Sequence, residues 1–154
     1  MSIDELLKLH EYDIYNNRNI DPNILCELAE IFSEESIDIL KYFSYTKFSS
    51  KFCWTNFIFI IKEMKYPQKL KGLPCLFELL QDINWPIFQE VAAALMSFDK
   101  KDIIPFMVRY LYQAYSEEDG MWISGIYMIA RIMNIQPSDF QIGKTCDLLH
   151  YRDV

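Results

Sequence analysis

Apolar residues recur at spacings of three and four along almost the whole chain, whereas strict alternation of apolar and polar residues is hard to find over any complete segment. This spacing is typical of amphipathic helices, because one face of an α-helix repeats about every 3.6 residues. The chain has 154 residues and 51% of them are hydrophobic, which is enough to bury an independent core. The sequence therefore predicts an all-α fold, with residues 1–154 in a single domain.

Capping residues and prolines divide the chain into roughly nine expected helices with short connections. The helix that contains Trp54 and Ile61 is apolar nearly all round, so we expect it to be central and buried on more than one side. Asp21-Pro22 is a clear start, because an acidic cap precedes a proline at the first helical position. The other expected starts are Ser2, Ser33, Ser49 or Ser50, Leu73, Pro86, Asp99, Ser116 with Asp119, and Ser138. The expected ends lie near His10, Phe32, Phe43, Gln81, Phe98, Tyr115, Ile132 and His150.

A sharp corner separates two of these helices at residues 79–86, which read Leu-Leu-Gln-Asp-Ile-Asn-Trp-Pro. One amphipathic helix stops there, a polar corner follows, and Pro86 opens the next helix. This order predicts an antiparallel helical hairpin. Trp85 lies at the corner and is costly to leave in water, so we expect it either to wedge between two helices or to face a partner.

The two halves of the chain share a pattern at an offset of 68 residues, which carries Trp54 onto Trp122. The same offset carries the apolar residues 58–61 onto residues 126–129. The pattern predicts an internal two-fold repeat, with an N-terminal half at 1–66 and a C-terminal half at 67–154. Stacked hairpins that bury their faces against one another are typical of an α-solenoid. The alternative is that any two buried amphipathic helices share such an apolar pattern.

Residues 73–133 resemble a known family. The resemblance is carried by Leu73-Pro74, the corner at 79–86, the alanine-rich helix after it, Ile103-Ile104-Pro105 and Trp122. These residues look like the bacterial HEAT-like family called domain of unknown function 5071, and the Gln-Asp-hydrophobic-Asn-Trp-Pro core is the specific part. The resemblance implies a fold of HEAT-like hairpins and a bacterial source, but it transfers no catalytic residue. Residues before about Tyr66 depart from the family pattern.

The chain has a formal net charge of −7 and a pI near 4.8. Nucleic-acid binding needs clustered Lys and Arg to displace counterions from phosphates, so we expect no nucleic-acid partner. An acidic domain suits a basic protein partner better, and the bland alternative is that a charge of this size only serves solubility.

Three further observations favour the cytoplasm as the location. The four cysteines, Cys26, Cys53, Cys75 and Cys146, form no C-x-x-C pair and lie in apolar surroundings typical of core positions in a reduced protein. The first five residues carry acid where a signal peptide needs a basic region. The longest apolar run, residues 52–61, is about half the length that spans a bilayer, so we expect no membrane association.

The side chains predict no catalytic residue, metal or cofactor. Cys146 and His150 lie four apart and would share one helix face, but they make only half of a zinc site. The other histidine, His10, is at the opposite end of the chain. The glycines are isolated, which excludes a phosphate-binding loop, and the chain has no G-x-S-x-G motif.

The candidate partner-binding residues combine acids with aromatic side chains. They are Asp82, Trp85, Tyr112, Tyr115, Glu117, Glu118 and Asp119. The three consecutive acids would form an acidic patch with Asp82 if two hairpin ends lie side by side, and the tyrosines lie one helical turn apart next to them. Such a surface suits a basic protein. The alternative is structural: acids in a first helical turn are stabilised by about 0.3–1 kcal/mol by the helix dipole, and tryptophans anchor helix packing.

We therefore expect a non-catalytic protein-interaction module. A sharper hypothesis is an immunity protein that binds and neutralises a basic bacterial toxin domain, because opposite charges would make that capture fast. The rival hypothesis is an enzyme or a small-ligand-binding protein with a pocket between the two halves, and it predicts carboxylates of perturbed pKa in that pocket. A third possibility is a structural subunit of a homo-oligomer.

Overall fold

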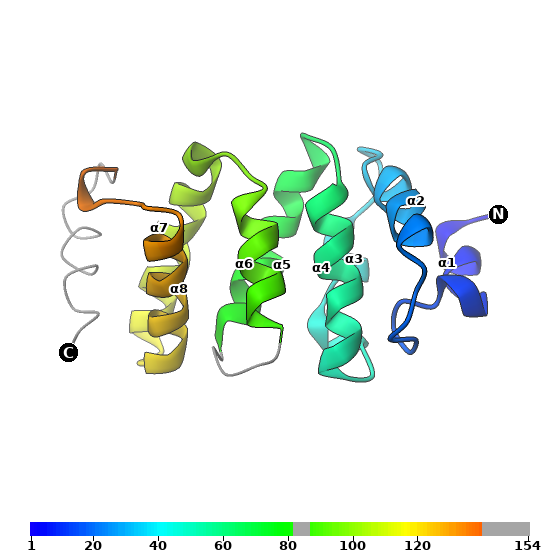
Figure 1. Cartoon of the computed structure of the whole chain (residues 1–154), viewed down its shortest axis with the longest axis horizontal. Coiled ribbons are helices and arrows are strands. Elements are labelled where there is room, and N and C mark those ends of the chain that lie inside the picture. The colour runs from blue at the N-terminus through cyan, green and yellow to red at the C-terminus, as the bar shows by residue number, and fades with distance from the viewer. Residues whose placement is uncertain (82–86, 140–154) are drawn as a thin grey trace. The chain divides into compact units, whose positions relative to one another are not determined.

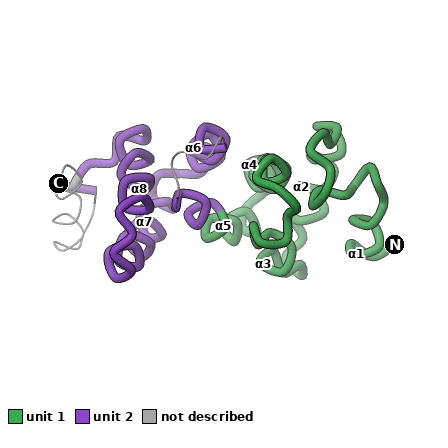
Figure 2. The backbone as a smooth tube through the Cα atoms, turned by 90° about the horizontal axis from the view of Figure 1, so that it is seen from below, with its two compact units in different colours: residues 1–75 green, residues 76–154 purple. Residues whose placement is uncertain are grey.

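The structure, a computed structural model, describes residues 1–81 and 87–139, and all regular secondary structure in those two ranges is helical, with no strand in either (Figure 1). It contains eight α-helices and six short 3-10 helices within these residues. The all-α prediction is confirmed. The chain divides into two compact units, Met1–Cys75 and Leu76–Val154, which are coloured separately in Figure 2.

The first unit is built around α2 and α4, which pack against each other. Its α-helices are α1 (Ile3–Leu6), α2 (Pro22–Phe32), α3 (Ile39–Tyr42), α4 (Trp54–Glu63) and the start of α5 (Leu73–Glu78), and its 3-10 helices are His10–Tyr12, Tyr45–Lys47, Lys51–Cys53 and Gln68–Gly72. Phe43 lies between the rings of Phe32 and Phe57, with centroids 4.8 Å and 5.9 Å away. Six of the ten residues of α4 are buried, so the prediction of a central, buried helix is confirmed.

A buried asparagine ties the N-terminal loop to this core. Asn56 lies on α4 with 2% of its surface exposed. Its side-chain amide donates hydrogen bonds to the backbone oxygens of Ile14, at 2.9 Å, and Asn17, at 2.8 Å. Buried carbonyls need partners, and this loop has no regular helix to supply them. One side chain therefore holds a loop that lies about forty residues earlier in the sequence.

The expected third helix, from Ser33 to about Phe43, is wrong at its start. Ser33 follows α2 instead, and its hydroxyl donates back to the Ala29 oxygen at 2.7 Å while accepting from the Lys65 backbone N–H at 2.9 Å. A serine hydroxyl that bonds to the residue four positions earlier closes a helix rather than opening one. The next helix, α3, begins only at Ile39, where the carboxylate of Asp38 accepts from the Leu40 N–H.

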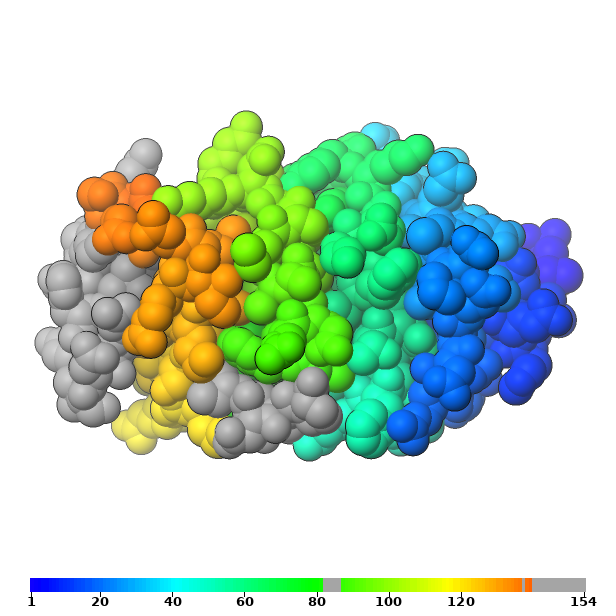
Figure 3. Space-filling view, viewed as in Figure 1, coloured from blue at the N-terminus to red at the C-terminus, as the bar shows by residue number. Residues whose placement is uncertain are grey.

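The second unit comprises the end of α5, the 3-10 helix Leu79–Gln81, α6 (Phe88–Met96), α7 (Lys100–Ser116), α8 (Gly120–Ile132) and a last 3-10 turn at Pro137–Asp139. α7 and α8 pack against each other, and α8 also contacts α6 and the Leu79–Gln81 turn. In Figure 3 the side chains of α6 and α8 form one continuous surface of this unit.

Three aromatic side chains from different helices form the centre of this unit. The rings of Phe77 and Tyr110 stack with centroids 5.4 Å apart, and Tyr110 contacts Trp122 at 5.8 Å. Trp122 is 2% exposed, and its indole N–H donates to the Phe77 backbone oxygen at 2.9 Å. Trp122 is therefore a core residue, and the hydrogen bond satisfies the N–H of its buried indole.

Other helix starts and one cysteine also differ from expectation. Ser116 is the last residue of α7, and Asp119 alone caps α8. The helix expected from Ser49 or Ser50 begins as a 3-10 turn, and α4 starts at Trp54. Cys53 and Cys75 are buried, but Cys26 is exposed, because the buried positions of α2 are on its other face, at Leu25, Leu28, Ala29 and Phe32. The first helix ends at Leu6 rather than near His10.

The two tryptophans of the proposed repeat occupy similar positions but different surroundings. Trp54 and Trp122 lie in the first turns of α4 and α8, and both indoles donate to a backbone oxygen. Trp54 bonds to Tyr45, nine residues earlier, whereas Trp122 bonds to Phe77, forty-five residues earlier. The elements that pack on the two helices therefore differ, and the internal repeat stays a prediction.

Replacing Asn56 by alanine tests the anchor of the N-terminal loop. The variant leaves the Ile14 and Asn17 carbonyls without their donor, so we expect the free energy of unfolding to fall by about 2–4 kcal/mol in urea titrations. Thr55→Ala, on the same helix, removes a hydroxyl that bonds locally to Phe52 and should cost less than about 1 kcal/mol. Equal losses in the two variants would contradict this role.

Glu78, half-buried at the end of α5, gives a prediction about pH. Burial raises the pKa of its carboxyl. The folded state therefore binds the proton more tightly than the unfolded state, and the stability that Glu78 contributes at about pH 4 is lost as the pH rises through the folded pKa. We expect Glu78→Gln, which does not titrate, to gain stability relative to the original protein between about pH 4 and pH 7 in urea titrations. A difference that does not change with pH would refute the prediction.

Candidate functional site

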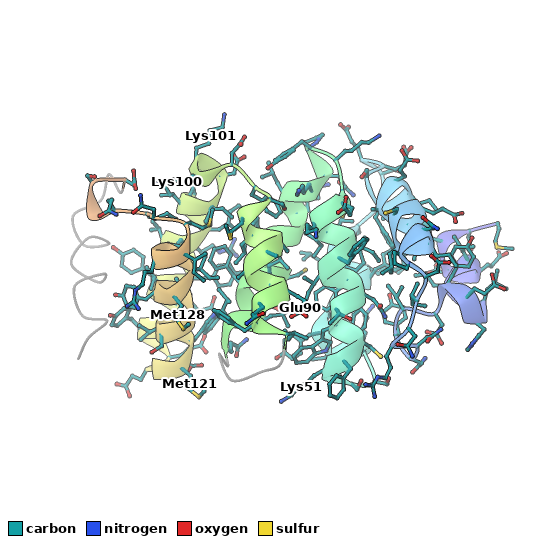
Figure 4. All side chains as sticks on the ribbon, in the orientation of Figure 1. Lys51, Glu90, Lys100, Lys101, Met121 and Met128 are labelled. Carbon is teal, nitrogen blue, oxygen red and sulfur yellow. The ribbon has the colours of Figure 1, made fainter. Side chains whose placement is uncertain are left out.

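The turn between α7 and α8 contains three of the seven candidate partner-binding residues, and Tyr112 and Tyr115 lie before it on α7. We call residues 117–119 (Glu117, Glu118 and Asp119) the acidic corner. It joins the end of α7 at Ser116 to the start of α8 at Gly120. Figure 4 shows Met121 at this end of the helix pair, and Lys100 and Lys101 at the opposite end. Asp82 and Trp85, the other two candidates, lie outside the described residues.

The backbone of the acidic corner closes α7 with a Schellman motif. The N–H of Glu118 donates to the Tyr115 oxygen at 3.1 Å, and the N–H of Asp119 donates to the Ala114 oxygen at 2.9 Å. This pattern requires a residue in the left-handed conformation just after the helix end. Glu118 takes that position, with φ of 54°. Glycine or asparagine usually takes that place. The equivalent turn after α8 does use an asparagine, Asn134, with φ of 55°.

Asp119 has a structural role within the corner. It is half-buried, and its carboxylate accepts the backbone N–H of Trp122 at 3.0 Å, as the cap of α8. A carboxylate at the N-terminus of a helix satisfies an otherwise unpaired donor and is stabilised by the helix dipole. Asp119 therefore fixes where the corner lies relative to the buried indole of Trp122.

The other two acids of the corner face solvent. Glu117 and Glu118 are both exposed, and in the part of the chain that the structure describes neither forms an ion pair with Lys or Arg. Glu117 accepts a hydrogen bond from the side-chain amide of Gln113 at 2.9 Å, one turn earlier on α7. The two carboxylates thus place negative charge on the surface from a turn whose backbone is fixed.

The two tyrosines of the candidate site lie in different surroundings. Tyr112 is 39% exposed. Tyr115 is half-buried, and its hydroxyl lies 3.0 Å from the hydroxyl of Tyr127 on α8. Tyr115 therefore links the two helices, and Tyr112 presents its ring to solvent.

A shallow concavity of about 660 Å³ lies over the corner. Its lining contains all three acids together with Gly120, Met121 and Ser124 from the first turns of α8. Met121 is 42% exposed. Sequence reasoning missed Met121 and Ser124; their only signal was their place in the first turns of the helix after the acids. The arrangement offers carboxylates beside an adaptable apolar side chain, which is suited to recognition of a partner surface.

The described ranges contain neither a metal-binding cluster nor a membrane-spanning helix. In residues 1–81 and 87–139, no group of three or more His, Cys, Asp or Glu side chains is placed to hold a metal ion. Cys146 and His150, the half site noted above, lie outside these ranges. Nor does any helix in them have the length and apolar character needed to cross a bilayer.

Comparison with known proteins places the chain in a family. The family model described as Domain of unknown function (DUF5071) matches residues 54–150, more than half of the chain, and the chain belongs to this family. The match begins at Trp54, the first residue of α4, so the expectation that residues before about Tyr66 depart from the family pattern is wrong for residues 54–65. No curated protein and no solved structure matched the chain.

Glu118 generates a prediction about stability. A non-glycine residue in the left-handed region costs about 1–2 kcal/mol, so Glu118→Gly should raise the free energy of unfolding by about 0.5–1 kcal/mol after the greater entropy of glycine in the unfolded chain is counted. Glu118→Ala removes the same carboxylate but keeps the backbone strain, and it is the matched control. If alanine stabilises as much as glycine in thermal unfolding, the gain comes from charge rather than from backbone conformation.

Proposed function

We propose that this protein is a non-catalytic interaction module that holds a basic surface of another protein against the acidic corner. The observation that carries the proposal is the pair of exposed carboxylates, Glu117 and Glu118, on a hydrogen-bonded turn, with exposed Met121 in the same concavity and exposed Tyr112 on the last turns of α7. A fixed turn loses little freedom on binding. Aromatic side chains are enriched among the residues that contribute most to protein interfaces.

The wider architecture that we propose is a HEAT-like solenoid of antiparallel hairpins with an internal repeat. The α7–α8 hairpin and the shared pattern around Trp54 and Trp122 support this proposal. In such folds each hairpin buries a face against its neighbours, and the loop ends are left for partners. The acidic corner is one of these loop ends.

The charge of the chain supports a basic partner. A net charge of −7 attracts a basic protein over long range and raises its association rate at low salt. In its sharper form the proposal is an immunity protein of the bacterial cytoplasm that binds and neutralises a basic toxin domain. Under that proposal the acidic corner would occupy the basic surface that the toxin uses on its own substrate.

The test is capture of partners from the native cells with tagged protein, followed by mass spectrometry. We expect one basic protein in stoichiometric amount, and loss of at least about 90% of it with the double variant Glu117→Lys, Glu118→Lys, because charge reversal within an interface costs several kcal/mol. The matched control is Glu34→Lys with Glu35→Lys, another pair of adjacent exposed acids, in the first unit. It makes the same change in net charge and should retain the partner.

Two outcomes would count against the proposal. Equal loss of the partner in both double variants would mean that only net charge attracts it. Absence of any reproducible protein partner would refute the interaction module itself. If a partner is found, co-expression then tests the sharper form: the original protein and the control should protect cells from the partner's toxicity, and the corner variant should not.

A further inference from the structure

A second concavity, of about 720 Å³, lies in the first unit, and its lining includes none of the residues of the acidic corner. Three separate segments line it, residues 4–8, 13–16 and 41–47. We call it the N-terminal pocket. Its volume is in the range of small-molecule sites, which are about 300–1,000 Å³.

The aromatic wall of the N-terminal pocket is fixed by contacts behind it. The Tyr15 hydroxyl donates to the Tyr42 backbone oxygen at 2.9 Å, which joins the loop to α3. The Tyr15 ring packs on Phe48, with centroids 4.8 Å apart, and the Tyr42 ring packs on Phe32, at 5.4 Å. Burial raises the pKa of Tyr15, so its phenol is neutral at physiological pH. The pocket therefore presents two anchored aromatic side chains.

The charges around the pocket do not cancel. Three lysines and two aspartates line it. Asp13 is satisfied by the loop itself, because its carboxylate accepts the backbone N–H groups of Tyr15 and Asn16 and the side-chain amide of Asn16. Asp4 pairs with Lys41 at 3.6 Å and raises the pKa of that amine. Among the described residues, Lys8 and Lys47 form no ion pair, and with Asp13 still charged the three lysines exceed the two aspartates by one charge.

The two remaining ammonium groups keep donors for a ligand. Lys47 gives one hydrogen bond to the Lys41 backbone oxygen, and an ammonium has three N–H donors. Both lysines are exposed at the pocket. This excess of positive charge beside two aromatic rings contrasts with the net charge of −7 of the whole chain. Ammonium groups form charge-assisted hydrogen bonds with phosphate and carboxylate oxygens.

We propose that the N-terminal pocket binds a small organic anion, with its phosphate or carboxylate group between Lys8 and Lys47 and a planar part against Tyr15 and Tyr42. The site is independent of the acidic corner and lies in the other unit. Its ligand class is a phosphorylated or carboxylated aromatic compound.

The experiment is a two-dimensional NMR titration of the whole chain, in which amide signals are followed while ligand is added. The probes are phenyl phosphate, benzoate and inorganic phosphate. We expect phenyl phosphate or benzoate to bind with a dissociation constant of about 1 mM or lower, with the largest shifts at residues 13–16 and 41–47. Inorganic phosphate should bind at least about fivefold more weakly, because it lacks the planar part. The relative affinities of phenyl phosphate and benzoate then identify the anionic group.

Two double variants, each of which removes two positive charges, test the role of the lysines in the pocket. Lys8→Gln with Lys47→Gln should weaken binding of the better probe at least about tenfold, because two charge-assisted contacts are lost. Lys62→Gln with Lys71→Gln removes the same charge from lysines of the first unit that do not line the pocket, and should change binding less than about twofold. If the double variant does not fold, the single variant Lys8→Gln is used for the same binding test.

Two results would overturn the proposal. One is the absence of localised shifts with both aromatic probes at about 10 mM, well above the expected dissociation constant. The other is an equal loss of binding in the two lysine pairs, which would reduce the effect to non-specific attraction. Equal affinities of inorganic phosphate and the aromatic probes would overturn the role given to the tyrosine rings.

Discussion

The hydrogen bond from the Trp122 indole to the Phe77 backbone oxygen is the interaction on which the second unit depends. It connects α8 to the end of α5, and Tyr110 of α7 packs against both aromatic rings. The backbone N–H of the same tryptophan is capped by Asp119. One residue therefore sets both the core of the unit and the position of the acidic corner at its surface. A buried polar edge without a partner would be costly, which makes this arrangement specific as well as stable.

The sequence predicted helices well where a cap and a breaker agreed. Asp21 before Pro22 predicted both the cap and the first residue of α2. The periodic apolar residues of α7 and α8 predicted the extents of those helices within a few residues. Two of the errors lie at serines, Ser33 and Ser116, which are at helix ends instead of helix starts. A serine hydroxyl can cap a helix start or, as at Ser33, bond back to the preceding turn, and only the fold decides between them. Membership of the family is consistent with the resemblance first seen around the 79–86 corner.

The candidate site was predictable in composition but not in the role of each residue. The run of three acids was visible in the sequence, yet Asp119 caps a helix whereas Glu117 and Glu118 face solvent. That division depends on the left-handed conformation of Glu118, which the sequence did not indicate because no glycine occupies that position. Tyr112 and Tyr115 are equally aromatic and one turn apart, but only the second has Tyr127 within hydrogen-bond distance. Spacing along a helix cannot identify the neighbour that a different helix supplies.

The side chain of Asn56 has a consequence for the pocket at the surface. The carbonyls that it holds, those of Ile14 and Asn17, flank Tyr15 and Asn16, which form one wall of the N-terminal pocket. The shape of this wall is therefore set from inside, by a helix that does not line the pocket. Binding and folding become thermodynamically linked through that amide, because a ligand that requires the ordered loop also favours the state in which α4 keeps its bonds to it. The thermal unfolding temperature of the first unit would then rise when the N-terminal pocket is occupied.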